Sequence, residues 1–427
     1  NSITMDGKFH HYIELFYITR FPDRKVKFYN CGISGDVANG VLRRMDDDIL
    51  VHQPTWSIVM LGMNDVNRSL YSNEKSKEPG IEKKRQESLN RYFKNVDSIV
   101  RLLISAGSKV ILQTPSIYDQ TAELPGTNFF GVNDALKQCA EYLRELASKY
   151  NLPIVDYWTT MNTVNAEVQQ RNPKATIIGN DRVHPNVPGH FLMAGVFLKT
   201  QHVPNYVSLI RVDVKPAGIE KSLNCDIKDL RINKAFISFT CTEKSLPFPL
   251  LNKGFNPDSL FHFTDELNKE IIQIKSLPKG SYILKIDSIE VGRYSENNFN
   301  EGVNLANNDM TPQYKHAAAM LQLLNQYWEL EGRLRRIKYV EYGLLGKDAN
   351  LYQKIDESSE RRFEKSLERF KGQPVEYIDY YRSNFKEFLI NKPLEKELQQ
   401  SCDERFSQIQ LSNKPTKHTF QIIKEVD

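Results

Sequence analysis

The sequence of 427 residues contains no apolar run long enough to cross a membrane, no internal repeat and no low-complexity tract. No charge of one sign dominates it either. The formal net charge is +4, and basic residues alternate with acidic ones, as in "EKKRQ", so nucleic-acid binding is not indicated. Hydrophobic residues at 40% and charged residues at 26% are ordinary globular values, which argue against a disordered chain or a fibre. A chain of this length predicts two or three domains.

Cysteine is scarce and scattered. The five cysteines include no Cys-x-x-Cys pair, so we expect no zinc site. An odd count leaves at least one thiol free. A Cys225–Cys241 disulfide is the alternative in an oxidising compartment, but we expect free thiols in the core.

The first two hundred residues alternate short β-rich runs with amphipathic helical stretches. The runs predict strands at residues 25–30, 56–62, 109–115 and 152–158. The stretches predict helices at residues 10–21, 36–50, 86–107, 132–150 and 190–200. This alternation is typical of an α/β fold with a parallel sheet covered on both faces. Right-handed crossovers place the carboxyl ends of all strands at one edge, which is where such folds bind ligands.

The pattern changes after "QHVPNY". Short alternating runs from Val207 onward predict a small β-domain, and a charged, helical pattern follows from about Asn304 to Gln400. The stretch "HTFQIIKEV" near the end predicts a strand that returns to the β-region. We therefore predict three consecutive parts: residues 1–203, an α/β domain; residues 204–303, a small β-rich domain; and residues 304–427, a mainly helical region.

Four short polar blocks in the first part carry residues suited to acyl transfer. They are "NSIT" at the start, "NCGISGD" after residues 25–29, "GMND" after residues 56–61, and "NDRVHPN" before the last predicted helix. Acyl transfer to water needs a hydroxyl, a base and a carboxylate that orients the base. Ser2, His184 and Asp181 offer these groups, and the Asp-x-x-His spacing lets one turn bring the carboxylate to the imidazole.

The same blocks offer donors for a developing oxyanion. Gly35 lacks a Cβ, so its N–H is able to approach a substrate oxygen closely. Asn64 supplies a side-chain amide, and the N–H of Ser2 makes a third donor. Each block taken alone also has a purely structural explanation as a turn, a helix cap or a solvated terminus. Their order and positions together favour a catalytic site.

The four blocks resemble those of the SGNH hydrolase superfamily, also called GDSL esterases and lipases. "NSIT" is similar to the block of the nucleophile, "NCGISGD" and "GMND" to the blocks of the oxyanion glycine and asparagine, and "DRVHPN" to the block of the catalytic acid and base. The resemblance implies a flavodoxin-like, three-layer α/β/α fold over residues 1–200. It also implies a serine esterase of the bacterial type that needs no metal or organic cofactor.

The resemblance departs from the family pattern at the start. The glycine that usually precedes the Asn1-Ser2 pair, and the first strand before it, are not in the sequence. In the family this strand lies in the middle of the sheet. We therefore expect an apolar strand ending in Gly to precede Asn1 in the natural protein.

The stretches "SFTCTEKSLPFPL", "LPKGSYILKIDSIEVGRYS" and "EGVNLANNDMTPQYKHA" resemble, more loosely, the C-terminal extension of certain large bacterial SGNH proteins, which often occur in glycan-degrading bacteria. This association implies carbohydrate O-acyl esters, most simply O-acetyl esters, as substrates, and a periplasmic or secreted location. The second half offers no catalytic residue; capping of the site, oligomerisation and polymer binding are its alternative roles. The oligomeric state is not indicated.

Substrate contacts are expected from the two longest loops at the ligand-binding edge, residues 66–80 and 116–131. Tyr71, Tyr118, Asp119 and Phe130 offer stacking faces and hydroxyl partners for a sugar, with loop packing as the structural alternative. A lipase or lysophospholipase is the alternative within the same chemistry. A non-catalytic glycan-binding protein is the alternative from a different class.

Overall fold

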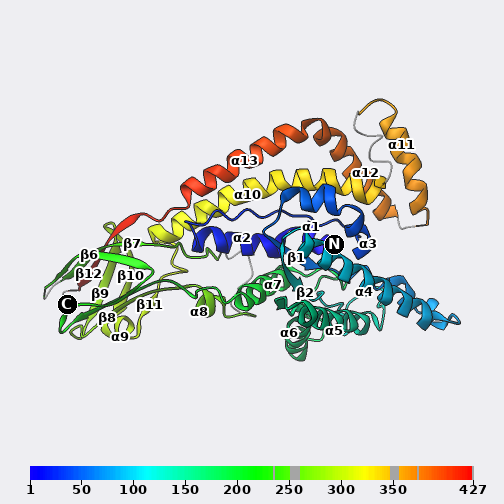
Figure 1. The fold of residues 1–427 in the computed structure, drawn as a ribbon. Helices are drawn as coiled ribbons and strands as arrows, with labels where there is room; N and C mark the ends of the chain where they lie inside the picture. The colour runs from blue at the N-terminus through cyan, green and yellow to red at the C-terminus, as the bar shows by residue number, and fades with distance from the viewer. Residues whose placement is uncertain (234–235, 251–259, 347–354, 373–374, 426–427) are drawn as a thin grey trace. The chain divides into compact units, whose positions relative to one another are not determined.

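The structure is a computed structural model that describes residues 1–233, 236–250, 260–346, 355–372 and 375–425 (Figure 1). The chain divides into two compact units, each assembled from three separate stretches. The first unit contains Asn1–His10, Tyr29–Thr200 and Glu329–Cys402; the second contains His11–Phe28, Gln201–Trp328 and Asp403–Asp427. The consecutive parts expected from the sequence stay a prediction. No described helix is both long and apolar enough to cross a bilayer.

The first unit is built on a parallel sheet of three strands in the order β1-β2-β3. These strands are β1 (Trp56–Met60), β2 (Lys109–Gln113) and β3 (Ile154–Val155). β1 and β2 pair in register from Trp56 opposite Lys109 to Met60 opposite Gln113. The predicted α/β class with a parallel sheet is confirmed.

Helices connect and cover these strands. They are α1 (Ser2–Met5), α3 (Ala38–Arg43), α4 (Ile81–Ser105), α5 (Val132–Tyr150), α6 (Tyr157–Arg171) and α7 (Val187–Thr200). The helices predicted at residues 86–107, 132–150 and 190–200 correspond to α4, α5 and α7. α6 is absent from the sequence prediction, because its polar face and its threonines gave no clear apolar stripe.

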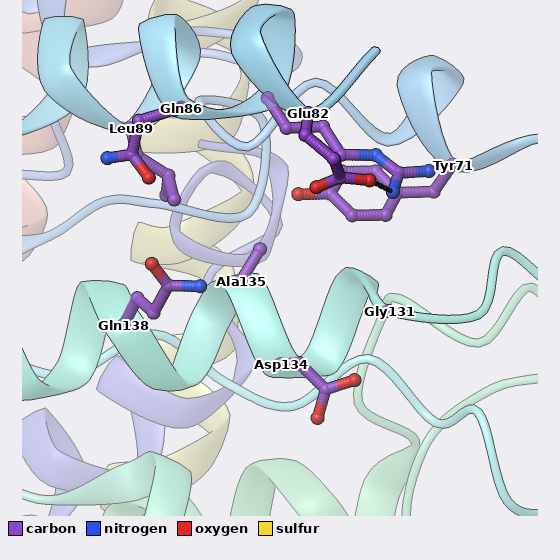
Figure 2. Close-up of a pocket in the computed structure, with 9 residues that line it drawn as sticks. Tyr71, Glu82, Gln86, Leu89, Gly131, Asp134, Ala135 and Gln138 are labelled. Atoms are coloured by element: carbon purple, nitrogen blue, oxygen red, sulfur yellow. Dashed lines mark hydrogen bonds and ion pairs between the residues drawn. The ribbon is translucent and has the colours of Figure 1, made fainter. Parts of the chain in front are cut away.

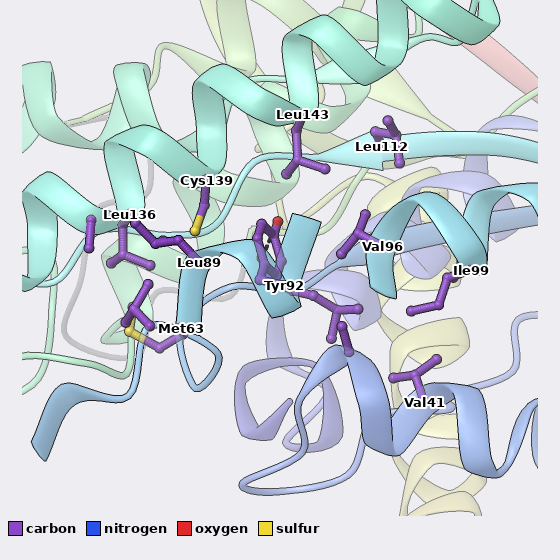
Figure 3. Close-up of a cluster of buried hydrophobic side chains, with 14 of the residues drawn as sticks. Val41, Met63, Leu89, Tyr92, Val96, Ile99, Leu112, Leu136, Cys139 and Leu143 are labelled. Carbon is purple, nitrogen blue, oxygen red and sulfur yellow. Dashed lines mark hydrogen bonds between the residues drawn. The ribbon is translucent and has the colours of Figure 1, made fainter. Parts of the chain in front are cut away.

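The core of this unit lies between α4, α5 and the sheet. Figure 3 shows Leu89, Tyr92 and Val96 of α4 opposite Leu136 and Cys139 of α5. All of these side chains are buried, as are Val110 and Leu112 of β2. The apolar positions of α4 and α5 recur at three- and four-residue spacing, so each helix presents one continuous stripe to the strands.

One predicted strand is wrong, and another is shorter than predicted. Residues 25–30 form no strand. Their residue types favour a strand, but no described strand pairs with this segment. The strand predicted at 152–158 is limited to Ile154–Val155, because the Asp156 side chain accepts a hydrogen bond from the Thr159 N–H at 3.1 Å and begins α6.

The helical region contributes to the first unit through α11 (Ser359–Ser366), α12 (Val375–Asn391), the end of α10 (Pro312–Lys338) and the start of α13 (Glu395–Ser412). A buried cluster joins these helices to the loop that precedes α3. In it, Ile33 packs with Ile337, Val340 and Phe388. The helical region therefore shares a core with a loop that carries one of the four polar blocks.

The second unit contains two sheets around one apolar core. Five strands lie in the order β10-β9-β12-β7-β6 and four in the order β11-β8-β4-β5. Their bounds are β4 (Tyr206–Val214), β5 (Ala217–Leu223), β6 (Cys225–Ile232), β7 (Phe236–Glu243), β8 (Lys269–Lys275), β9 (Ser281–Ile286), β10 (Ile289–Ser295), β11 (Val303–Asn304) and β12 (Lys417–Lys424). The helices α2 (Lys8–Arg20), α8 (Phe263–Leu267) and α9 (Glu296–Glu301) accompany them.

The C-terminal strand lies inside the five-stranded sheet. β12 pairs antiparallel with β7 on one side and with β9 on the other. The Phe420 ring stacks on Phe239 of β7 with centroids 5.2 Å apart. The predicted return of the chain to the β-region is confirmed. All five cysteines are free thiols, including Cys225 and Cys241.

Two buried carboxyl groups lie in this unit. Glu243 of β7 accepts a hydrogen bond from Ser208 Oγ, and Glu270 of β8 lies close enough to interact with it. Burial first, and then the neighbouring Glu243, raises the pKa of Glu270 well above its usual range. The surroundings therefore favour the neutral form of Glu270 over the charged form.

Candidate active site

Asn1 fixes the turn that carries Ser2. Its side-chain Nδ2 donates to the Met60 carbonyl at the end of β1, at 3.0 Å, and its Oδ1 accepts from the Thr4 N–H at 3.0 Å. The second bond caps α1, so Ser2 is the first residue of this one-turn helix. The Asn1 side chain thus anchors the hydroxyl of Ser2 near the carboxyl end of β1.

The structure brings Ser2, His184 and Asp181 together. Ser2 Oγ lies 2.7 Å from His184 Nε2, although 182 positions separate the two residues in the chain. On the other side of the ring, His184 Nδ1 is hydrogen-bonded to Asp181 Oδ2. A proton on Nδ1 leaves Nε2 able to accept the Ser2 proton, which is the arrangement that a general base requires.

The Asp181 carboxylate is stabilised in its charged form. Its Oδ1 accepts hydrogen bonds from the N–H groups of Val183 and His184, both at 3.0 Å. Burial alone would raise the pKa of Asp181, but these bonds and the one from the His184 ring outweigh it and lower the pKa to about 2. Asp181 is therefore ionised over the working range of any ordinary enzyme.

Arg182 holds the turn between Asp181 and His184 in place. Its backbone has φ +64°, an uncommon value for a residue other than glycine. The buried guanidinium donates from Nη1 to the carbonyls of Asp119 and Ala122, each at 3.0 Å, and from Nη2 to Leu124. These bonds tie the turn to the loop after β2. No local motif in the sequence marks this role of Arg182, since only the fold brings the two loops together.

The three blocks around Ser2 are linked by close packing and hydrogen bonds. Asn30 Nδ2 donates to the Met5 carbonyl at 3.0 Å. At Gly32 an added Cβ would lie 2.4 Å from the Met5 nitrogen, so only glycine fits there. Asp65 accepts from the N–H groups of Ala38 at 2.7 Å and Gly62 at 3.1 Å.

The expected oxyanion donors are preorganised. Gly35 has φ +74°. Apart from its two chain neighbours, no atom of the described residues lies within 4 Å of where a Cβ would stand, so its surroundings are open. Asn64 Nδ2 donates to the Asp36 carbonyl at 3.0 Å. This bond fixes the amide with one of its two hydrogens and leaves the second hydrogen for a ligand.

A buried ion network supports this loop from the helical region. Arg44 binds Asp36 Oδ2 at 2.9 Å and also contacts Asp48. Arg335 of α10 makes a bidentate pair with Asp48, at 2.8 and 2.7 Å, and donates to the Asn30 carbonyl at 3.1 Å. Sequence reasoning did not find Arg335, because 287 positions separate it from Asp48 and no local motif marks it.

Comparison with known proteins identifies the family to which this site belongs. The GDSL-like lipase/acylhydrolase family matches residues 5–192. Residues 5–192 belong to the SGNH hydrolase superfamily. The predicted family is thereby confirmed, and membership supports ester hydrolysis as its chemistry.

Two relatives of this SGNH hydrolase differ in coverage. An acetylxylan esterase of Geobacillus stearothermophilus is 26% identical over 179 residues, which cover 42% of this chain and 74% of that protein. A solved structure of a gut microbial diltiazem-metabolizing enzyme is similar over 100% of this chain and 96% of its own, with a TM-score of 0.88 and 28% identity. The second comparison extends the similarity in fold to both units of the chain.

The four residues expected to contact substrate have different surroundings in the SGNH hydrolase. Tyr118 and Asp119 are buried, and the Tyr118 hydroxyl accepts from the Phe129 N–H at 2.9 Å. The Asp119 carboxylate accepts from the N–H groups of Thr121 and Ala122 and from side chains, so it is occupied in holding its loop. The structure gives both residues a role in packing.

The other two candidates, Tyr71 and Phe130, differ from each other in exposure. Tyr71 is buried under Arg85, whose guanidinium carbon is 4.2 Å from the ring centroid, whereas Phe130 is 64% exposed. Figure 2 shows Tyr71 at a cavity of about 220 Å³ between α4 and α5. Its other polar lining residues are Glu82, Arg85, Gln86, Asp134 and Gln138. Of the four candidates, only Phe130 presents a largely exposed ring.

Among the residues that the structure describes, no group of three or more His, Cys, Asp or Glu side chains is placed to hold a metal ion.

Proposed function

We propose that this SGNH hydrolase is a serine esterase with Ser2 as nucleophile, His184 as general base and Asp181 as the residue that orients the base. The observation that carries the proposal is the continuous chain of hydrogen bonds from Ser2 Oγ through the His184 ring to Asp181. If Ser2 were only a solvated serine, its Oγ would not be expected to bond to His184 Nε2.

The proposed reaction proceeds through an acyl-enzyme. His184 Nε2 takes the proton of Ser2 as Oγ attacks the ester carbonyl carbon. The N–H groups of Ser2 and Gly35 and the amide of Asn64 stabilise the oxyanion. His184 then protonates the leaving alcohol, and a water molecule repeats the sequence on the acyl-enzyme to release the acid.

For the substrate we propose O-acetyl esters of carbohydrates. The acetylxylan esterase relative supports this substrate class. The test is acetate release from a panel of acetylated polysaccharides by the wild type and by His184→Ala. A chain-length series of 4-nitrophenyl esters separates the lipase alternative: if octanoate reacts much faster than acetate, the carbohydrate proposal fails.

Small-molecule acetate esters are the second candidate. The similarity over the whole chain to a diltiazem-metabolizing enzyme favours this candidate, since diltiazem is itself an acetate ester. Deacetylation of diltiazem is to be measured beside the polysaccharide panel. Full activity in Ser2→Ala would refute Ser2 as the nucleophile for either substrate. A wild type that hydrolyses none of these esters would instead favour the alternative of a non-catalytic glycan-binding protein.

A further inference from the structure

Arg68 lies four residues after Asn64, at the start of a short 3-10 turn (Arg68–Tyr71). Its Nη1 makes two long hydrogen bonds, 3.3 Å to the Met63 carbonyl and 3.4 Å to Asn64 Oδ1. These bonds hold the guanidinium beside the amide proposed to bind the oxyanion. Both use the same nitrogen.

The other edge of the guanidinium is unoccupied. Within the described residues, Arg68 Nε and Nη2 donate to no group, and no carboxylate forms an ion pair with this side chain. This Nε–Nη2 edge is the one that matches the two oxygens of a carboxylate. The side chain is partly buried, and burial lowers the pKa of Arg68, so its charge lacks part of the stabilisation that water gives elsewhere.

The charged and hydroxyl groups that act electrostatically on Arg68 come from the candidate active site and from α12. Asp181 is near enough to act on the guanidinium electrostatically, but its two oxygens are engaged with His184 and Val183. Tyr377 of α12 and the buried Tyr118 are the other polar groups in electrostatic range. Within the described residues, Asp181 thus forms no ion pair with the Arg68 guanidinium.

α12 adds aromatic rings to the same region. Tyr377 is 54% exposed and Tyr380 44% exposed, and the spacing of three places both on one side of the helix. The Tyr380 hydroxyl interacts with Ser34, the residue before Gly35. Two half-exposed rings of the helical region therefore border the catalytic loops of the first unit.

We propose that Arg68 binds a carboxylate on the alcohol part of the ester, with Tyr377 and Tyr380 offering faces to the ring that bears it. The preferred substrates are then O-acetylated acidic sugars. This inference rests on the proposed esterase function and deepens it, because it names the charge of the substrate.

The test uses a matched pair of substrates, O-acetylated glucuronic acid and its methyl ester, at neutral pH. We expect the wild type to have the higher kcat/KM for the free acid. Arg68→Gln should reduce the ratio of the two kcat/KM values by roughly 10- to 100-fold, the range for a lost charge-assisted hydrogen bond, mainly through KM. Arg68→Lys should keep part of the preference for the free acid over the methyl ester. In the wild type, high salt should weaken this preference.

Arg85→Gln is the matched control, because the Arg85 guanidinium is already bonded to Glu82 and the Leu70 carbonyl. It should leave the ratio unchanged. An active wild type whose ratio does not change in Arg68→Gln overturns the proposal, as does an equal loss on both substrates, which would limit Arg68 to holding Asn64. A wild type that cleaves neither substrate, nor 4-nitrophenyl acetate, refutes the esterase function instead.

Discussion

Replacing Asp181 by Asn should lower kcat by about 10⁴-fold, which corresponds to about 5 kcal/mol of transition-state stabilisation. The side-chain oxygen of Asn is still able to accept from the Val183 and His184 N–H groups, which bond Oδ1 at 3.0 Å in the wild type. The amide NH₂ then faces His184 Nδ1, so the ring takes the tautomer with its proton on Nε2. That tautomer has no lone pair for the Ser2 proton.

The assay is steady-state hydrolysis of 4-nitrophenyl acetate, with circular dichroism and thermal unfolding to show that the fold is retained. Because the two backbone hydrogen bonds are retained, we expect only a small change in Tm. His184→Ala sets the lower limit of the rate. A kcat for Asp181→Asn within tenfold of the wild type, in a protein that unfolds normally, would refute the role of Asp181.

Three further predictions concern other parts of the chain. Asn64→Ala should lower kcat by about 10²–10³-fold, the usual loss for one oxyanion donor, measured on the same ester; a loss below fivefold would contradict the assignment. Arg335→Met leaves the buried Asp48 with one cation instead of two, so the Tm of the protein in calorimetry should fall by roughly 5–15 °C. An unchanged Tm would show that the ion pair adds no stability. Glu270→Gln should flatten the dependence of stability on pH. In the wild type the unfolded chain loses the Glu270 proton as pH rises past the ordinary carboxyl pKa, whereas the folded chain keeps it, so stability falls by up to about 1.4 kcal/mol per pH unit. Thermal unfolding between pH 5 and pH 9 measures this slope, with the exposed Glu301→Gln as control, and equal slopes in Glu270→Gln and the wild type would contradict the prediction.

The sequence predicted those parts of the fold that local pattern determines. The apolar stripes of α4 and α5 and the β-rich runs of β1 and β2 each contain their own signal. Residues 25–30 show the limit of such signals, because a strand exists only where another strand accepts its hydrogen bonds. α6 shows the same limit for helices, since its capping residue, Asp156, stands inside a run that looks like a strand.

In the candidate site, too, local sequence motifs predict some residues, whereas others are found only from the three-dimensional structure. The sequence was sufficient to find the five proposed catalytic and oxyanion residues, because they occur in short blocks whose residue types and order indicate a catalytic site. These residues are Ser2, Gly35, Asn64, Asp181 and His184. The bonds from Arg335 to Asp48 and from Arg182 to Asp119 depend on three-dimensional folding alone. Burial, which decides whether Tyr118 is available to a ligand, is likewise a property of the packed structure.

The most direct test of the account is covalent labelling with a fluorophosphonate, an electrophile that reacts with activated serine hydroxyls, followed by peptide mass spectrometry. We predict stoichiometric modification of Ser2 in the wild type, and its loss in His184→Ala. Modification of a different serine, or none at all in a protein that hydrolyses esters, would contradict the claim that Ser2 is the nucleophile.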